Sequence, residues 1–149
     1  MDSQRISKET CNVLFALADG REIWGEVFLN LFGELHGGPQ RVGELLNGDE
    51  PFIPIKTEEG TLLIHLLQLV SAQVASEVEL NELMTLGEHY RVKVQTVLGK
   101  SIDAEVYVDL PEGGRRVKDF MNRSQGFLRF IVGDQVLYLN RNFIVCAQD

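Results

Sequence analysis

The chain contains an internal repeat, and this repeat constrains its fold more than any other feature. At an offset of 79 residues, the matching pairs are Val13/Val92, Gly20/Gly99, Ile23/Ile102, Glu26/Glu105, Val27/Val106 and Leu31/Leu110. At an offset of 75 residues, they are Arg41/Arg116, Val42/Val117, Asn47/Asn122, Phe52/Phe127, Leu62/Leu137, Ala72/Ala147 and Gln73/Gln148. The offset changes in a Gly- and Pro-rich stretch, where a surface loop tolerates a different length. Residues 13–73 and 92–148 are therefore predicted to be two copies of one small unit.

Each copy begins with a predicted β-hairpin. Apolar residues alternate over 13–17, and again at the matching place in the second copy. A turn follows at Gly20 or Gly99, where glycine supplies the positive φ that tight hairpins require. Apolar residues then occupy every second position over 23–31 and 102–110. This period of two predicts a long second strand in each copy.

A short helix and three more strands complete each predicted unit. The helices carry apolar residues at positions i, i+3 and i+4, namely Val42, Leu45 and Leu46, and Val117, Phe120 and Met121. Asn47 and Asn122 follow them, and asparagine tolerates the geometry in which helices end. The later strands are predicted at residues 52–57, 62–65 and 69–74, and at residues 127–132, 136–140 and 143–148.

A linker helix is predicted between the copies. Residues 76–79 read Ser-Glu-Val-Glu, a capping-box pattern, and Gly87 is a suitable stop for a helix over 77–86. The expected organisation is a first small β-barrel repeat at 1–75, a linker at 76–89 and a second repeat at 90–149.

This order of elements resembles the Sm-like small β-barrel superfamily. The resemblance rests on a Gly-turned first hairpin, a long second strand, and a last strand pair joined by Asn140, Arg141 and Asn142. It looks closest to a bacterial branch in which a short helix ending in Asn lies between strands two and three. The resemblance implies a mainly β protein made of two tandem, bent barrels of about five strands each. Proteins of that superfamily commonly form rings and bind RNA.

The residues that bind RNA in that family are only partly matched. The family pattern has an Asp and an Asn in the loop after strand two, and an Arg-Gly pair between strands four and five. The second copy has Asp109 and Asn122 twelve residues apart, with Asn142 rather than glycine after Arg141. The first copy has residues 66–68, Leu-Leu-Gln, at the equivalent of the Arg-Gly pair. The resemblance therefore implies no RNA site in the first copy.

The net charge of −8 is unevenly distributed along the chain. Residues 1–75 carry 5 basic and 11 acidic side chains, residues 76–89 carry 4 acidic ones, and residues 90–149 carry 9 basic and 7 acidic ones. General nucleic-acid binding needs accumulated positive charge, so the overall acidity argues against it. Only the second copy escapes this objection.

Five basic residues of the second copy form a candidate phosphate or RNA site: Arg115, Arg116, Lys118, Arg123 and Arg141. Loops after strands two and four lie on the same side of such a barrel, so these side chains would converge and could hold phosphate through paired hydrogen bonds. The alternative is an ordinary solvated surface balanced by Glu112 and Asp119.

A candidate interface lies on the outer face of the first copy, and its residues are Leu14, Trp24, Phe28, Phe32, Leu66 and Leu67. The second copy has mostly polar residues at the matching positions. Contiguous apolar surface usually marks an interface, and Trp and Phe are enriched there. The alternative is that the linker helix covers this face through Val78, Leu80, Leu83 and Met84.

No catalytic or metal-binding constellation is recognised in the sequence. His36, His65 and His89 lie beside no Cys or carboxylate at ligand spacing, so neither a metal nor a cofactor is expected. Cys11 and Cys146 are expected to be free thiols. Without a signal peptide or an apolar run of membrane length, a soluble, cytoplasmic protein is expected.

The sequence thus favours a non-catalytic interaction or assembly module that forms a homo-oligomer or binds a protein partner. The alternative is RNA or nucleotide-phosphate binding through the basic loops of the second repeat. The first hypothesis rests on the apolar outer face, and the second rests on the basic residues.

Overall fold

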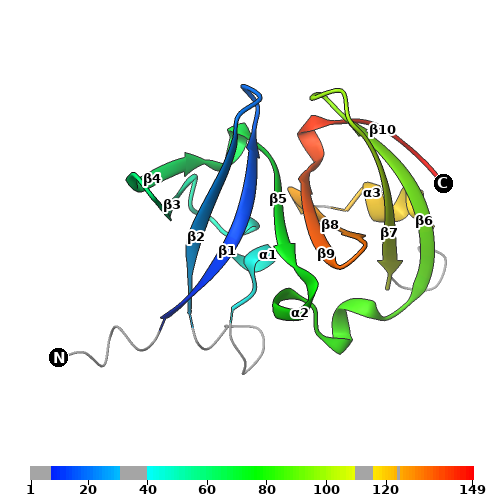
Figure 1. Ribbon diagram of the computed structural model, residues 1–149. Helices are drawn as coiled ribbons and strands as arrows, with labels where there is room; N and C mark the ends of the chain where they lie inside the picture. The colour runs from blue at the N-terminus through cyan, green and yellow to red at the C-terminus, as the bar shows by residue number, and fades with distance from the viewer. Residues whose placement is uncertain (1–7, 31–39, 110–115, 124) are drawn as a thin grey trace.

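A computed structural model describes residues 8–30, 40–109, 116–123 and 125–149, and its regular structure is mainly β, as expected (Figure 1). The first half contains β1 (Lys8–Leu17), β2 (Glu22–Asn30), α1 (Val42–Leu46), β3 (Phe52–Thr57), β4 (Gly60–His65), the 3-10 turn η2 (Leu66–Gln68) and β5 (Leu69–Ala75). The second half contains β6 (Glu88–Thr96), β7 (Ser101–Val108), α3 (Val117–Met121), β8 (Phe127–Val132), β9 (Gln135–Asn140), the 3-10 turn η4 (Arg141–Phe143) and β10 (Ile144–Gln148). The same order of elements therefore occurs twice.

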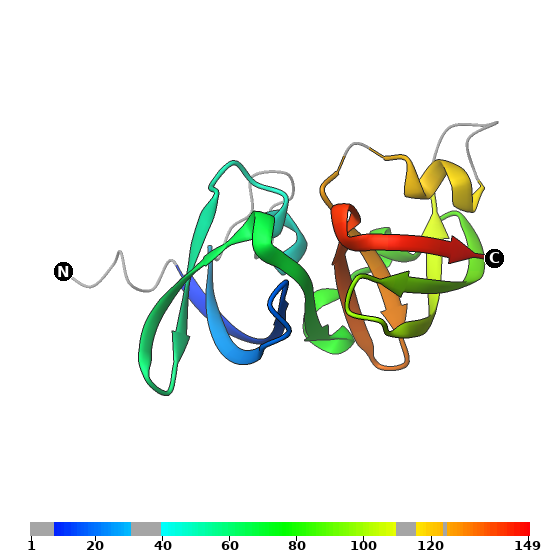
Figure 2. The ribbon, with the colours of Figure 1, turned by 90° about the horizontal axis from the view of Figure 1, so that it is seen from above.

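The ten strands form one antiparallel sheet in the order β10-β6-β7-β8-β9-β5-β1-β2-β3-β4. The sheet bends strongly within each half, so that two lobes lie side by side (Figure 2). Strand β9 of the second half pairs with β5 of the first, which makes the sheet continuous across the lobes. The sheet is open, with β10 and β4 as its two edges. The sequence led us to expect two separate barrels, whereas the strands are joined in a single open sheet.

The hairpin turns have the predicted glycine geometry. Gly20 has a φ of 92° and Gly99 a φ of 83°, both in the region that favours glycine. The helices α1 and α3 end at Asn47 and Asn122, also as predicted. Local sequence patterns therefore set the hairpins and the helix ends.

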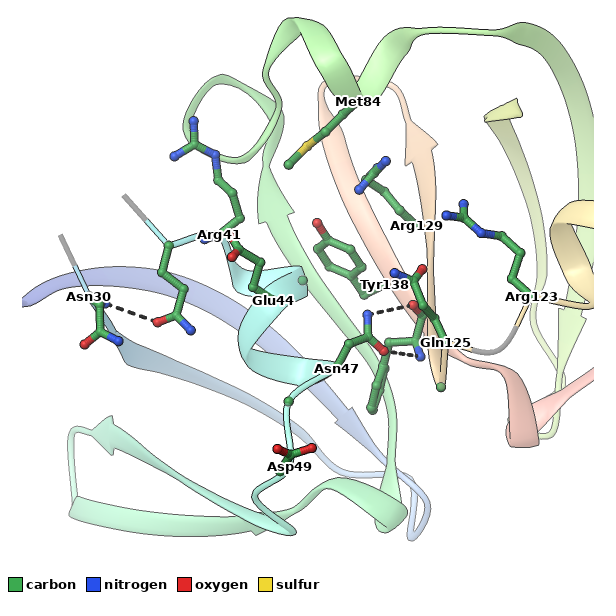
Figure 3. Close-up of a pocket in the computed structure, with 15 residues that line it drawn as sticks. Asn30, Arg41, Glu44, Asn47, Asp49, Met84, Arg123, Gln125, Arg129 and Tyr138 are labelled. Atoms are coloured by element: carbon green, nitrogen blue, oxygen red, sulfur yellow. Dashed lines mark hydrogen bonds between the residues drawn. The ribbon is translucent and has the colours of Figure 1, made fainter. Parts of the chain in front are cut away.

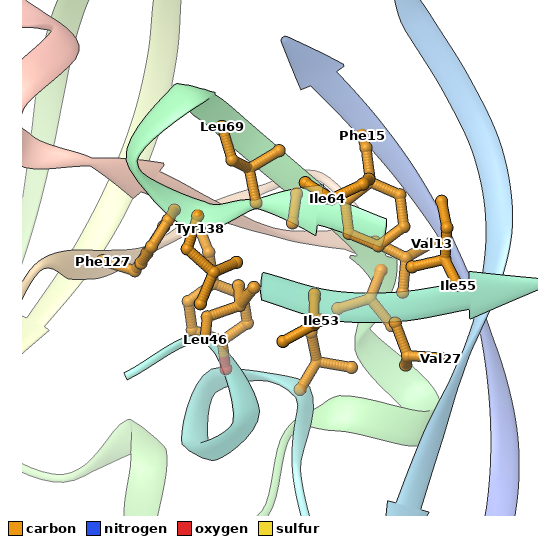
Figure 4. Close-up of a cluster of buried hydrophobic side chains, with 14 of the residues drawn as sticks. Val13, Phe15, Val27, Leu46, Ile53, Ile55, Ile64, Leu69, Phe127 and Tyr138 are labelled. Carbon is orange, nitrogen blue, oxygen red and sulfur yellow. The ribbon is translucent and has the colours of Figure 1, made fainter. Parts of the chain in front are cut away.

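Two clusters of buried hydrophobic side chains fill the two lobes. Val27 and Val106, at matching positions, are 0% and 1% exposed in the first and second cluster. The first cluster also contains Phe127, Val136 and Tyr138 from β8 and β9, so the second half of the chain contributes to it. Phe127 and Tyr138 lie beside Leu46 and Leu69 in Figure 4.

Strand β9 contributes to both clusters because side chains alternate between the faces of a strand. Val136 and Tyr138 lie in the first cluster, and Leu137 and Leu139 lie in the second. The two lobes therefore share a strand as well as a sheet.

The linker differs from the predicted helix over 77–86. It forms a single turn, α2 (Ser76–Glu79), and then a 3-10 turn, η3 (Glu82–Thr85). The helix stops because Leu80 adopts an extended conformation (φ −78°, ψ 146°), while the Asn81 side chain accepts a hydrogen bond from the Met84 backbone. The predicted capping box is also wrong, because the Glu79 side chain is buried and bonds elsewhere.

Candidate functional site

The junction between the repeats is a regular antiparallel ladder. Strand β5 pairs with β9 through Ser71↔Leu139, Ala72↔Tyr138, Gln73↔Leu137, Val74↔Val136 and Ala75↔Gln135. Side chains from paired residues share a face, so Tyr138 and Ala72 both point toward the first cluster. The junction therefore combines backbone pairing with packing of one repeat into the core of the other.

A buried carboxylate connects three parts of this junction. Glu79 is 1% exposed and accepts hydrogen bonds from the backbone N–H groups of Val42 and Gly43, each at 3.0 Å. The Tyr138 hydroxyl donates to the same carboxylate at 2.5 Å. Burial raises the pKa of Glu79 above its ordinary value, although these hydrogen bonds oppose the rise. Burial and the nearby Glu79 also raise the pKa of Tyr138, so its hydroxyl stays protonated and donates.

Two asparagines join the backbones of the repeats. The Asn47 amide donates to the Phe127 carbonyl at 3.1 Å and accepts from the Phe127 N–H at 2.9 Å. From the other repeat, the Asn140 amide donates to the carbonyls of Leu66 and Leu69. Paired hydrogen bonds of this kind fix the register in which the two repeats meet.

A cavity of about 710 Å³ lies between the repeats beside α1 (Figure 3). Arg41 of the first repeat and Arg123 and Arg129 of the second line it, together with Glu44 and Asp49. Burial and the nearby charge of Arg129 lower the pKa of Arg123. The cavity therefore holds partly desolvated guanidinium groups close to one another, an arrangement that favours an anionic ligand.

The structure separates the predicted basic residues into different surroundings. Arg123 lines the cavity and lies over the Phe120 ring, 5.7 Å from its centroid. The Arg141 guanidinium donates to the backbone carbonyl of Arg123, which brings these two residues together. Arg116 and Lys118 are exposed on α3 and are not among the residues that line the cavity. Arg115 lies outside the described residues.

Sequence reasoning missed Arg41 and Arg129. Arg129 lies on a strand whose neighbours are hydrophobic, and Arg41 belongs to the acidic first repeat. Their proximity to Arg123 depends on the pairing of β5 with β9. No signal within either repeat could have indicated it.

The predicted interface residues also have different surroundings. Trp24 is 63% exposed and Leu67 is 62% exposed, whereas Leu66 is buried in the first cluster. Leu14 is half-buried and lines a groove of about 220 Å³ between the repeats, and Phe28 is half-buried. Phe32 lies outside the described residues.

The linker leaves Trp24 open, which is contrary to the alternative reading of that segment. Val78 and Leu83 are themselves exposed, and Leu80 packs against the first cluster. The segment therefore has apolar surface of its own.

The outer face of β3 and β4 is a further apolar surface, which the sequence analysis did not identify. Phe52, Pro54, Leu63 and His65 share this face because Phe52 pairs with His65 and Pro54 with Leu63. Phe52 is 50% exposed and Leu63 is 61% exposed, and the rings of Phe52 and His65 stack 4.6 Å apart. We call these four residues the β3–β4 face. The alternation over 52–57 could have revealed it, had both faces of the strand been considered.

The two sheet edges are much more exposed than the strands at matching positions. Strand β9 is buried over Val136–Asn140, whereas Gly60–Leu63 of β4 are exposed. Strand β5 is buried or half-buried throughout, whereas Val145–Gln148 of β10 are exposed. The junction thus covers one copy of each edge and leaves the other copy open.

Within the described residues, no group of three or more His, Cys, Asp or Glu side chains is placed to hold a metal ion. No helix in that part of the chain has the length and apolarity to cross a lipid bilayer. No family model, curated protein or solved structure matches this chain.

Proposed function

We propose that this protein is a non-catalytic assembly module built from two Sm-like repeats, and that it works as a homo-oligomer. The observation that carries the proposal is the exposed apolar β3–β4 face beside an unpaired sheet edge. Large apolar side chains on a flat edge favour association, and natural edge strands usually carry charges or bulges that prevent it. Strand β4, with the sequence Gly-Thr-Leu-Leu-Ile-His, has no charged Lys, Arg, Asp or Glu and no proline.

The Sm-like part of the proposal is supported by the order of elements and by the bend of each half. Each half has two long hairpin strands, a short helix, two more strands, a 3-10 turn and a last strand. Within each half the last strand lies beside the first, as in β5-β1-β2-β3-β4. We expect a cytoplasmic location, because the two cysteines are unpaired and their thiols suit a reducing compartment.

Light scattering of the full chain over a range of concentrations tests this function. We expect a mass that exceeds that of one chain and increases or stays multimeric as the concentration rises. A single-chain mass at every concentration would contradict homo-oligomerisation.

A second function is favoured by the arginines in the cavity between the repeats. The lowered pKa of Arg123 reflects a guanidinium group that is partly removed from water and close to Arg129. We propose, as the alternative, that this cavity binds the phosphate of RNA or of a nucleotide. Titration of the full chain with a single-stranded RNA at low salt should then show salt-sensitive binding that is lost in Arg123→Glu. An unchanged affinity in that variant would contradict this alternative.

A further inference from the structure

We infer that β4 of one molecule pairs antiparallel with β10 of a second copy, in the register that joins β9 to β5 within the chain. This inference rests on the proposed function, because it names the surface through which the homo-oligomer forms. It begins from the order of the sheet, in which the second repeat presents β9 to β5 of the first. The remaining edges, β4 and β10, are the repeat equivalents of β9 and β5.

The internal junction predicts the register between molecules. The constant offset of 75 residues converts Ser71↔Leu139, Ala72↔Tyr138 and Gln73↔Leu137 into Cys146↔Ile64, Ala147↔Leu63 and Gln148↔Leu62. The bulge is also repeated, since β5 and β10 both shift register against their hairpin neighbours near matching residues, Val70 and Val145. The two edges therefore have the same backbone form as the strands already paired.

The apolar side chains of the β3–β4 face match those that are buried at the internal junction. Phe127 and Tyr138 enter the first cluster, and their equivalents are Phe52 and Leu63, both exposed. The receiving positions also differ in the expected way. Leu46 and Leu69 are buried under Phe127 and Tyr138, whereas their equivalents, Met121 and Ile144, are only half-buried (Figure 4). Docking of a second copy would cover both sides.

A pair of size changes preserves the fit. At the internal junction the large Tyr138 lies against Gly43, where an added Cβ would be 2.6 Å from the Tyr138 hydroxyl oxygen. The equivalents of these residues are the smaller Leu63 and the larger Lys118, which is exposed on α3. The smaller residue on one edge leaves room for the larger residue on the other.

Charge also favours contact between unlike repeats. The first repeat has a net charge of −6 over residues 1–75, and the second has +2 over residues 90–149. Docking β4 on β10 places Glu50, just before β3, on the side of the second copy that carries Arg116 and Lys118. Docking two first repeats together would instead bring like charges into contact.

The contact joins two different surfaces, so it propagates head to tail and leaves one free edge of each kind after every addition. A closed ring or an open chain satisfies this geometry, whereas a two-fold dimer through β4 alone does not. The occupant of the β4 edge is therefore a second copy of this chain, presenting β10.

Disulfide cross-linking of the full chain tests the register. In a background with Cys11→Ser and Cys146→Ser, we would combine Leu63→Cys with Ala147→Cys, because the inference places these residues opposite each other. The edges lie at opposite ends of the sheet, so a bond between them must join two molecules (Figure 1). We expect cross-linked multimers on a non-reducing gel. The matched control combines Thr61→Cys with Ala147→Cys, two residues out of register, and should cross-link far less.

A charge on the edge provides a second test. Leu63→Lys should raise the apparent Kd of self-association by about tenfold or more, because it places a charge in the packed centre of the contact. Leu83→Lys makes the same change at an exposed leucine of η3, away from both edges, and should leave the Kd unchanged.

The outcomes separate this inference from the proposed function. Multimers that neither cross-link above the control nor respond to Leu63→Lys would overturn the β4–β10 contact and leave the assembly function standing. A chain that stays monomeric at every concentration would overturn both. Equal cross-linking in the two cysteine pairs would overturn the register.

Discussion

The Tyr138 hydroxyl donates a 2.5 Å hydrogen bond to the carboxylate of Glu79, and this contact joins β9 of the second repeat to the linker. The same carboxylate accepts the first two N–H groups of α1 in the first repeat. One buried side chain thus connects the linker with both repeats. A buried carboxylate is tolerated when hydrogen bonds compensate its loss of hydration, and three printed donors serve Glu79.

Loss of the tyrosine hydroxyl should weaken the junction. Tyr138→Phe leaves the Glu79 carboxylate buried with one fewer donor, so we expect the free energy of unfolding to fall by about 1–3 kcal/mol. Urea denaturation measures it, with Tyr107→Phe on β7 as a control at a half-exposed ring. Equal stability of Tyr138→Phe and the unchanged protein would show that the bond contributes nothing.

The raised pKa of Glu79 predicts a specific dependence of stability on pH. The folded chain holds the proton more tightly than the unfolded chain, so its stability falls as the pH rises from the ordinary value of 4.5 through the raised folded-state pKa. Below 4.5 this penalty is absent, and above the folded-state pKa it is complete. Glutamine does not titrate, so the stability of the unchanged protein relative to Glu79→Gln should fall across this window.

Urea denaturation at a series of pH values measures the difference between the two proteins. Glu77→Gln, at an exposed position in the same turn, should show no such trend. A relative stability that rises with pH would mean that the hydrogen bonds to Glu79 outweigh its burial.

The close contact of Gly43 with Tyr138 predicts that the glycine cannot be replaced without cost. Gly43→Ala places a Cβ within 2.6 Å of the Tyr138 hydroxyl oxygen, so we expect a loss of about 1–3 kcal/mol in the free energy of unfolding. Gly126→Ala is the control, because nothing lies within 4 Å of its added Cβ. In a Tyr138→Leu background the cost of Gly43→Ala should shrink, and an undiminished cost would contradict the steric explanation.

The Asn47 side chain should stabilise the contact between the repeats. Asn47→Ala removes both hydrogen bonds to the Phe127 backbone, and we expect it to lower the free energy of unfolding by about 1–3 kcal/mol. Asn12→Ala, at an exposed position on β1, is the matched control. A loss in the control as large as that in Asn47→Ala would refute the role of the paired bonds.

The sequence predicted the local structure well, because side-chain alternation and turn residues act over a few positions. The strands over 52–57 and 127–132 have the predicted bounds, and α1 and α3 end at Asn47 and Asn122. The linker was predicted incorrectly because its capping-box pattern competes with distant contacts. Glu79 bonds to α1 and Tyr138, which no local pattern reveals.

The junction could not be predicted from either repeat alone. Tyr138 reads as an ordinary strand residue, and only the pairing of β9 with β5 places it in the first cluster. The cavity arginines depend on the same pairing. The exposure of Phe52 and Leu63 is likewise a consequence of which edge is left uncovered.

Hydrogen exchange at low and high protein concentration tests the central claim, that a second copy covers the open edges. Amides of β4 and β10 should exchange more slowly at high concentration, while those of β5 and β9, already paired with each other, should change little. Exchange at β4 and β10 that is the same at every concentration would contradict the claim.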